Sequence, residues 1–337
     1  MKEYEIRPKN VFDEFLNISL RKAERLFSDK SKFIEVSCPA CGSSRSRQAF
    51  LKNNFNYETC KDCSSLFVNP RPTSADLSAY YRDSGAVEHW AQVFYKDTEG
   101  ARRVRIVKPR AKMIGKWAKQ MNVDGTFCDV GSGFGVLLEE IKELGIFEEI
   151  IGIEPASDLA KICRDRGFRI FEKNLEDLDT EEARANFATC FEVIEHVFEP
   201  LEFLRAASNI LIPGGLFIFS TLTISGFDLG ELWSNSKSVC PPNHLNLMSV
   251  SGLAALVKRC GLELVDLSTP GMLDVDILRN MLEESSEISI SRFARQILEA
   301  NETVQEKFQN FLQENRLSSH VVVVARKIES LGADSVL

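Results

Sequence analysis

Apolar residues occur in two spacings along this chain, and the two alternate through its second half. Short continuous runs predict strands near 126–130, 149–154, 168–172, 187–192, 215–222, 262–268 and 320–326. Between the runs, apolar residues recur every three or four positions, which predicts helices. Because strands and helices alternate, we expect an α/β fold with a seven-stranded, mainly parallel sheet and helices on both faces.

Other segments depart from this alternation. Residues 10–28 have the spacing of an amphipathic helix, and residues 73–81 that of a short helix. Apolar residues near 50–57 and 66–68 predict short strands that form a hairpin and its neighbour. In residues 271–317 apolar positions again recur at helical spacing, so we expect a helical insertion before the last strand.

The first strand of the alternating region leads into a glycine-rich turn. Gly131, Gly133 and Gly135 stand two positions apart, just after Asp129. Glycine lets a ligand approach the main chain at the start of the following helix, although similar turns also occur in ordinary loops. Glu154 ends the second strand, where a carboxylate can accept ribose hydroxyls. Its position favours a nucleotide-binding turn over an ordinary loop.

These residues resemble the class I S-adenosylmethionine-dependent methyltransferases. CDVGSGFG is similar to the family's first motif, and GIEPA to the acidic end of its second strand. Residues 191–197 and 213–218 are similar to the segments after its fourth strand and before its fifth. The resemblance covers roughly residues 110–327 and implies a Rossmann-like methyltransferase sheet. In that family the last strand is antiparallel and inserted between its neighbours.

The resemblance also implies an S-adenosylmethionine site at the carboxyl ends of the strands. The expected cofactor-binding residues are Asp129, Gly131, Gly133, Gly135, Glu154, Asn174, Leu175, Phe191 and Glu192. Asp129 and Gly131 would lie beside the amino-acid part of the cofactor, and Glu154 at its ribose. Asn174 and Leu175 follow the third strand, where relatives hold the adenine edge.

Four of the nine cysteines have the spacing of a metal site. Cys38, Cys41, Cys60 and Cys63 form two CxxC pairs separated by eighteen residues, as in a four-thiolate zinc ribbon. Disulfides are the alternative, but they suit a small secreted domain rather than a chain of this kind. Since four thiolates leave no position open for water, we expect the zinc to be structural and not catalytic.

Composition and charge limit the possible partners. The chain has 337 residues, of which 44% are hydrophobic, and a net charge of −8, which disfavours general nucleic-acid binding. No apolar run approaches the ~20 residues that cross a bilayer, so we expect a soluble, cytoplasmic protein without a membrane partner. The run 101–119 carries eight basic residues and no acid. It is either a solvated face or a binding surface for the phosphates of an anionic substrate.

Two histidines are candidates for catalysis. His244 lies in a loop after the fifth strand that is similar to the substrate-side loop of nucleotide-sugar methyltransferases with an amino-terminal zinc ribbon. In those C-methyltransferases the matching histidine is thought to act with a nearby tyrosine, but here Pro241 takes the tyrosine's place. O-methylation is therefore at least as well supported. His196 either takes part in catalysis or only begins the next helix.

The resemblance thus predicts a methyltransferase that modifies a sugar or nucleotide sugar, with His244 as general base. An RNA methyltransferase that uses the ribbon and run 101–119, and a non-catalytic interaction module, remain alternatives. A dehydrogenase is disfavoured because its turn reads GxGxxG and this one GxGxG. The acceptor is expected to be small and anionic. The insertion is either a lid, a cap or the contact of a homodimer.

The predicted division of the chain follows from these segments. It comprises an N-terminal helix (1–34), the zinc ribbon (35–72), a connector (73–108), the methyltransferase domain (109–328) with its insertion (271–317), and a flexible tail (329–337). Within the connector, His89, Trp90, Phe94 and Tyr95 form an aromatic cluster. This cluster either covers the cofactor or packs between the two modules.

Overall fold

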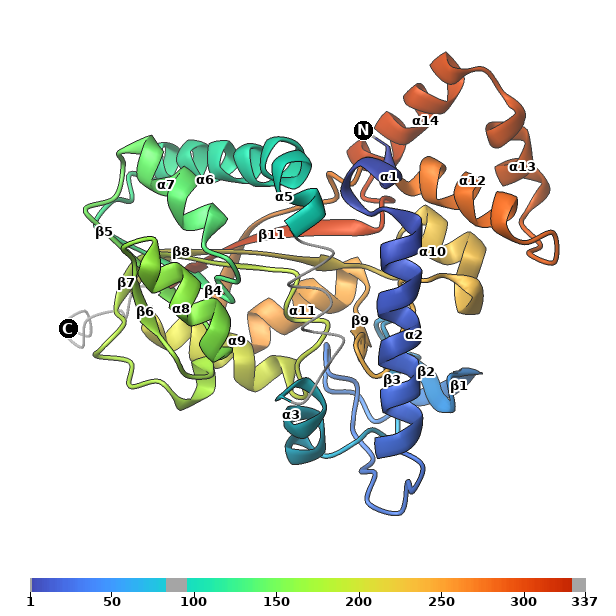
Figure 1. Cartoon of the computed structure of the whole chain (residues 1–337), viewed down its shortest axis with the longest axis horizontal. Coiled ribbons are helices and arrows are strands. Elements are labelled where there is room, and N and C mark those ends of the chain that lie inside the picture. The colour runs from blue at the N-terminus through green and yellow to red at the C-terminus, as the bar shows by residue number, and fades with distance from the viewer. Residues whose placement is uncertain (1, 83–95, 329–337) are drawn as a thin grey trace, which may run out of the picture.

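A computed structural model describes residues 2–82 and 96–328 (Figure 1). The aromatic cluster at 89–95 and the tail 329–337, both singled out from the sequence, lie outside the described residues. The described chain forms two β-sheets, one of seven strands and one of four. Among the described residues, no helix has the length and apolar character needed to span a membrane.

The larger sheet confirms the predicted α/β class. Its strands are β4 (Thr126–Val130), β5 (Glu149–Ile153), β6 (Arg169–Phe171), β7 (Ala185–Phe191), β8 (Leu211–Leu222), β10 (Leu262–Ser268) and β11 (His320–Lys327). Their order is β10-β11-β8-β7-β4-β5-β6. Strands β4 to β8 pair in parallel, whereas β11 is antiparallel to both β8 and β10. The inserted antiparallel strand implied by the resemblance is therefore present.

Helices cover both faces of this sheet (Figure 1). Apolar residues of α6 (Lys108–Met121) and α7 (Val136–Leu144) pack on one face, and those of α9 (Pro200–Ile210) and α11 (Val250–Arg259) on the other. Successive residues of a strand point to opposite faces. In β11, Val322 and Val324 therefore join the first layer, while Val321 and Val323 join the second. This double burial explains the continuous valine run in the sequence.

The remaining helices of this region connect the strands. α8 (Ser157–Asp165) joins β5 to β6, and a 3₁₀ turn, η3 (Leu175–Asp177), follows β6. α5 (Lys96–Arg102) continues through the π-helical turn η2 (Arg103–Val107) into α6.

The smaller sheet unites two distant parts of the chain. Its order is β1 (Ser46–Lys52), β2 (Phe55–Cys60), β3 (Leu66–Val68) and β9 (Asn246–Leu247). The first three strands belong to the cysteine module, by which we mean residues 35–72. β9 lies between β8 and α11 and pairs with β3 in antiparallel fashion. A two-residue strand leaves no periodic signal, so the sequence did not predict this pairing.

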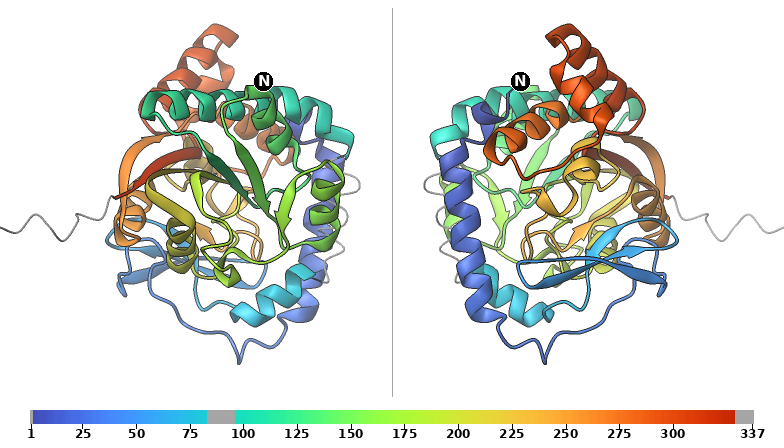
Figure 2. Two further views of the ribbon diagram at one scale, coloured as in Figure 1. Left: turned by 90° about the vertical axis from the view of Figure 1, so that its left-hand side faces the viewer. Right: turned by 90° about the vertical axis from the view of Figure 1, so that its right-hand side faces the viewer.

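Helices frame the molecule at one end (Figures 1 and 2). α2 (Lys9–Leu26) runs from the cysteine module toward the insertion, which consists of α12 (Asp274–Glu284), α13 (Arg292–Glu299) and α14 (Glu302–Glu314). The short helices in this region are α1 (Glu3–Ile6), α10 (Phe227–Leu232) and η4 (Trp233–Asn235), and α3 (Ser74–Arg82) follows the cysteine module. The Glu3 backbone N–H donates to Asp276 over 2.8 Å, which ties the N-terminus to the insertion.

Two details differ from the sequence-based expectations. β8 begins at Leu211 rather than at residue 215, because the predicted turn before residue 215 is part of the strand. Its pairing with β7 shifts register between Ala185 and Phe187. The basic run is less free than a solvated face: Arg103 pairs with Glu139 and Glu140, and Arg110 turns inward. By contrast, Lys108, Lys112, Lys116 and Lys119 are exposed.

Candidate active site

The glycine turn forms a bend with one open side. Gly131, Gly133 and Gly135 all have positive φ (77°, 53° and 74°), a region that other residues rarely adopt. A Cβ on Gly135 would lie 2.9 Å from Cys163 Sγ, whereas one on Gly133 would meet nothing within 4 Å. The chain is therefore tightly packed behind the turn and open in front of it, where a nucleoside could approach the main chain.

Glu154 holds this turn in place. It follows β5 and is only 6% exposed. Its Oε2 accepts a hydrogen bond from the Gly133 N–H over 2.8 Å, and its Oε1 accepts one from the Ala156 N–H over 2.9 Å. Burial raises the pKa of Glu154, while these two backbone bonds act in the opposite direction. Each oxygen keeps a second lone pair, so ribose hydroxyls can still be accepted.

Asp129 lies behind the turn rather than in the open. It is 4% exposed, and its Oδ1 accepts a hydrogen bond from the Thr189 hydroxyl over 2.7 Å. Burial raises its pKa to about 7, against the lowering effects of the Thr189 bond and of Arg110. A carboxylate in this position costs stability whenever it is ionised in the folded protein.

We expect Asp129→Asn to stabilise the protein at alkaline pH, by roughly 1–3 kcal/mol. The folded-state pKa of about 7 lies above the ordinary value of 3.8, so the wild type loses stability as pH rises through that interval. The gap between variant and wild type should therefore be widest above pH 7 and should close as pH falls toward 4. Thermal unfolding across this range measures it, and a constant gap would contradict the assignment.

The predicted adenine-edge residues have different environments. Asn174 is exposed, and its side chain donates to Asp177 over 2.9 Å. Leu175 is 4% exposed and packs in the core beneath the sheet. Asn174 is thus available to a ligand at the sheet edge, and Leu175 anchors the turn that carries it.

Glu192 lies at the centre of a polar cluster directly after β7. It has a left-handed backbone (φ 57°). Its Oε1 lies 3.0 Å from Arg110 Nη2 and 2.7 Å from His320 Nε2, and it accepts a hydrogen bond from the Ser220 hydroxyl. Burial opposes its ionisation, but His320 and Arg110 lower the pKa of Glu192 overall. Glu192 is therefore an anion paired with the Arg110 guanidinium.

The cluster includes residues that sequence reasoning missed. Arg110 also stacks on the Phe191 ring, with its guanidinium carbon 4.5 Å from the ring centroid. His320 begins β11, a buried strand of valines, at the sheet edge where ligands bind. A histidine at this position was the sequence signal that could have identified it as a site residue.

Glu195, His196 and His244 form a second cluster next to this one. One ligand atom from each lies within 4.8 Å of the others, and the two imidazole centroids are 4.8 Å apart. His196 Nδ1 lies 2.8 Å from the Asn243 carbonyl oxygen, and His244 Nδ1 lies 2.6 Å from that of Ser238. Since carbonyls only accept, both Nδ1 atoms carry a hydrogen, and the protonation of each Nε2 depends on the pKa of its ring.

The charges in this cluster differ between its members. Burial and the neighbouring His244 lower the pKa of His196 to about 3, so this imidazole is neutral near pH 7. Burial also opposes charge on His244, but Cys240 and Glu195 raise its pKa to about 9. Burial, with Glu192 nearby, raises the pKa of Glu195 to about 7. A neutral base, a cation and a carboxyl group that can share a proton are thus brought together. A divalent cation bridging the three groups is also compatible with their spacing.

Comparisons with known proteins identify the family of the chain. The family described as "Methyltransferase domain" matches residues 101–267. A ubiquinone biosynthesis O-methyltransferase of Xanthomonas axonopodis pv. citri is 31% identical over 179 residues, which are 49% of this chain and 73% of that protein. The chain belongs to the S-adenosylmethionine-dependent methyltransferases.

Two further proteins are similar to this methyltransferase. A ubiquinone biosynthesis O-methyltransferase of Xanthomonas oryzae pv. oryzae is 30% identical over 181 residues, covering 49% of this chain and 73% of its own. A solved S-adenosylmethionine-dependent methyltransferase from Clostridium acetobutylicum is 11% identical, with a TM-score of 0.45, covering 73% of this chain and 100% of its own.

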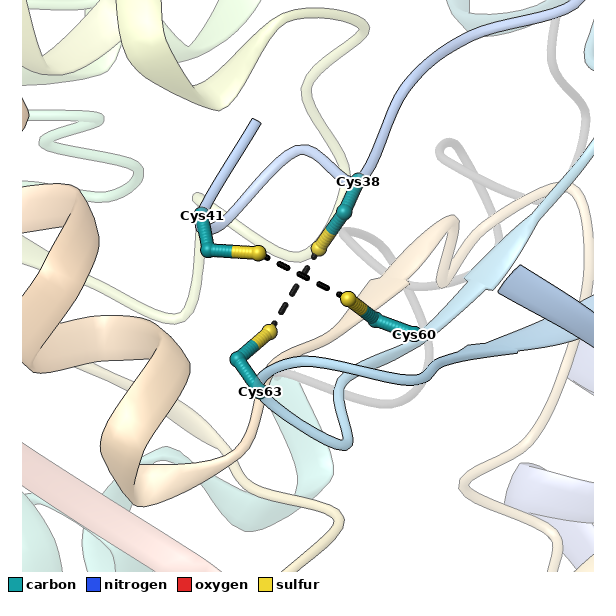
Figure 3. A group of neighbouring side chains, drawn as sticks. All are labelled: Cys38, Cys41, Cys60 and Cys63. Carbon is teal, nitrogen blue, oxygen red and sulfur yellow. Dashed lines mark hydrogen bonds between the residues drawn. The ribbon is translucent and has the colours of Figure 1, made fainter. Parts of the chain in front are cut away.

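The methyltransferase also has a cysteine cluster with the geometry of a metal site. The sulfur atoms of Cys38, Cys41, Cys60 and Cys63 point toward a common centre (Figure 3). The Cys38–Cys63 and Cys41–Cys60 sulfur pairs are each 3.5 Å apart, far longer than a disulfide bond of about 2.05 Å. Tetrahedral Zn–S bonds of about 2.3 Å give sulfur separations of about 3.8 Å, so the four donors fit zinc.

The cysteine module supports the His244 loop of the methyltransferase directly. The Tyr57 hydroxyl donates to the His244 carbonyl oxygen over 2.6 Å, just before β9 pairs with β3. Arg71 is 1% exposed, and its Nη1 donates to Asn246 Oδ1 over 3.1 Å. Serines at the start of α11, Ser249 and Ser251, donate to the Cys63 carbonyl oxygen. The position of His244 thus depends on the module that holds the cysteines.

Proposed function

We propose that this methyltransferase transfers the methyl group of S-adenosylmethionine to a hydroxyl oxygen of a small anionic acceptor, a sugar or nucleotide sugar. The observation that carries the proposal is the cluster of Glu195, His196 and His244. It lies after β7, one strand from the glycine turn that follows β4. There it can receive a proton from a hydroxyl placed before the methyl group.

Each of the chain's groups has a defined part in this reaction. S-adenosylmethionine supplies a strongly electrophilic methyl group. The Gly131–Gly135 turn and Glu154 would bind its nucleoside, and Arg110 would attract its carboxylate. His196 Nε2 would accept the proton of the acceptor hydroxyl, and Glu195 would stabilise the resulting imidazolium. His244, already cationic, would hold the acceptor oxygen in place.

The choice of oxygen has separate support. The relatives that share about 30% identity are named O-methyltransferases. The phenol groups near His244 are occupied elsewhere: Tyr57 donates to the His244 carbonyl oxygen, and Tyr81 donates to that of Asn243 over 3.2 Å. Neither is free to assist carbanion formation, which favours O- over C-methylation.

The modular division of the chain is part of the proposal. We infer that residues 35–72 bind a structural zinc ion through Cys38, Cys41, Cys60 and Cys63, and that residues 109–328 form the methyltransferase domain. The β3–β9 pairing supports treating the two as one working unit. The RNA hypothesis is less well supported, because Arg103 and Arg105 of the basic run are paired with carboxylates.

Two measurements test the proposed function. Calorimetry on zinc-loaded protein should show binding of S-adenosylmethionine and of its demethylated product. Mass spectrometry with labelled cofactor and a panel of nucleotide sugars, sugar phosphates, neutral sugars and short RNA should show a product heavier by one methyl group, only for an anionic sugar. Methylation of RNA alone, or absence of cofactor binding, would overturn the proposal.

A further inference from the structure

A cavity lies beside the loop that carries His244. Its volume is about 190 Å³, the space of about six water molecules. It is formed by α2, by the end of β1 and by residues 237–243. Its polar lining includes Ser19, Lys52, Lys237, Cys240 and Asn243. Of these lining residues, Cys240 contacts His244, and the Asn243 carbonyl oxygen contacts His196, so the cavity adjoins the catalytic cluster.

Lys52 gives the cavity an unbalanced positive charge. Its Nζ donates to the Ser236 carbonyl oxygen over 2.7 Å, and among the described residues it has no carboxylate partner. Lys237 differs, because it is paired with Asp13 and Glu284 at 2.6 Å each. Burial lowers the pKa of Lys52 to about 8, and the neighbouring Cys240 only partly opposes this shift.

Two buried donors without partners also line the cavity. Asn243 is 6% exposed, and its Nδ2 has no hydrogen-bond partner among the described residues, although its Oδ1 accepts from Tyr80. The Ser19 hydroxyl is 3% exposed and is likewise unpaired. Leaving a buried donor unpaired costs about 1–3 kcal/mol, so such groups commonly mark the place of a ligand or water.

We propose that this cavity binds an anionic oxygen group, a phosphate or carboxylate, of the methyl acceptor. Lys52 would supply the counter-charge, and Asn243 Nδ2 and Ser19 Oγ would donate hydrogen bonds to the oxygens. The inference rests on the proposed function in one respect, that the anion belongs to the acceptor. Because Asn243 also accepts from His196 through its carbonyl oxygen, an anion bound here would fix the loop that orients the catalytic cluster.

Cys240 provides a reporter for the charge of the cavity. It lines the cavity and is 8% exposed. On full-length, zinc-loaded protein, its alkylation by iodoacetate, an anion, can be compared with that by neutral iodoacetamide, using peptide mass spectrometry. We expect the rate ratio to exceed that of N-acetylcysteine by about tenfold, since a cationic pocket concentrates anions. Lys52→Met should remove the excess, while Lys52→Arg and the exposed-surface control Lys307→Met should keep it.

Protection experiments then identify the anion. Glucose 1-phosphate should protect Cys240 from alkylation and should raise the unfolding temperature of the wild type more than that of Lys52→Met. Both effects should appear at a lower concentration of glucose 1-phosphate than of inorganic phosphate. Equal effects of the two would overturn the acceptor assignment, since the site would then be one for free phosphate. The site itself would be overturned if Lys52→Met left the ratio of the iodoacetate and iodoacetamide rates unchanged. It would also be overturned if Cys240 resisted both reagents and phosphate did not stabilise the protein. None of these measurements requires turnover, so a negative result here can be distinguished from a failure of the proposed function.

Discussion

Removal of the proposed zinc ion from the methyltransferase is expected to abolish methyl transfer while S-adenosylmethionine still binds. Structural zinc contributes about 10–16 kcal/mol in small modules, more than most of the ~5–15 kcal/mol that stabilises a whole domain. Without zinc we expect the cysteine module to become disordered. The β3–β9 pairing and the Tyr57 hydrogen bond to the His244 carbonyl oxygen would then be lost. The glycine turn and Glu154 lie on the other sheet and are held by their own contacts.

The measurement combines three readouts on chelator-treated protein. Calorimetry should give a cofactor affinity within about threefold of the loaded form, a change of under 1 kcal/mol. Hydrogen exchange of residues 238–249 should rise to that of an open loop, and turnover should return when zinc is added. Cys41→Ser should reproduce the loss, whereas Cys260→Ser, a buried cysteine outside the module, should keep its zinc. Full protection of residues 238–249 without zinc would contradict the coupling.

His196→Ala is expected to lower kcat by about 10²–10⁴ with little change in cofactor affinity, because general-base catalysis typically contributes that factor. His196 is the neutral imidazole of the cluster, with a pKa of about 3 and its Nε2 free. Steady-state kinetics with the acceptor found by mass spectrometry, together with cofactor calorimetry, measures the two effects separately.

A second variant separates chemistry from structure at this position. His196→Asn keeps a donor that can reach the Asn243 carbonyl but has nothing in place of Nε2. We expect it to be as slow as His196→Ala. If His196→Asn restores turnover, the histidine only holds the loop. If His244→Asn is slower than His196→Asn, the proton goes to His244 instead.

Local signals in the sequence accounted for the framework. The two apolar spacings predicted the strands of the large sheet, because a residue's spacing to its neighbours decides which face it buries. β4, β10 and the start of β11 were predicted to the residue. Ser249 caps α11, since its hydroxyl oxygen accepts a hydrogen bond from the Gly252 N–H over 2.9 Å.

Contacts between distant residues were beyond such signals. Arg110 and His320 meet at Glu192 although 82 and 128 residues separate them from it along the chain. The sequence left open whether the basic run is a solvated face or a binding surface, and it gives no sign that Arg103 and Arg110 have carboxylate partners on other elements.

The sequence by itself determined the sheet, the glycine turn with Glu154, and the four-cysteine spacing, because each depends on residues close together along the chain or on a recurring pattern of strands. Only the tertiary structure decided that the cysteine module completes a sheet with β9 and thereby places His244 beside His196. It also decided that Lys52 faces unpaired donors from α2 and the His244 loop. The physical reason is that packing and hydrogen bonds between separate elements fix these positions, and no local propensity encodes them.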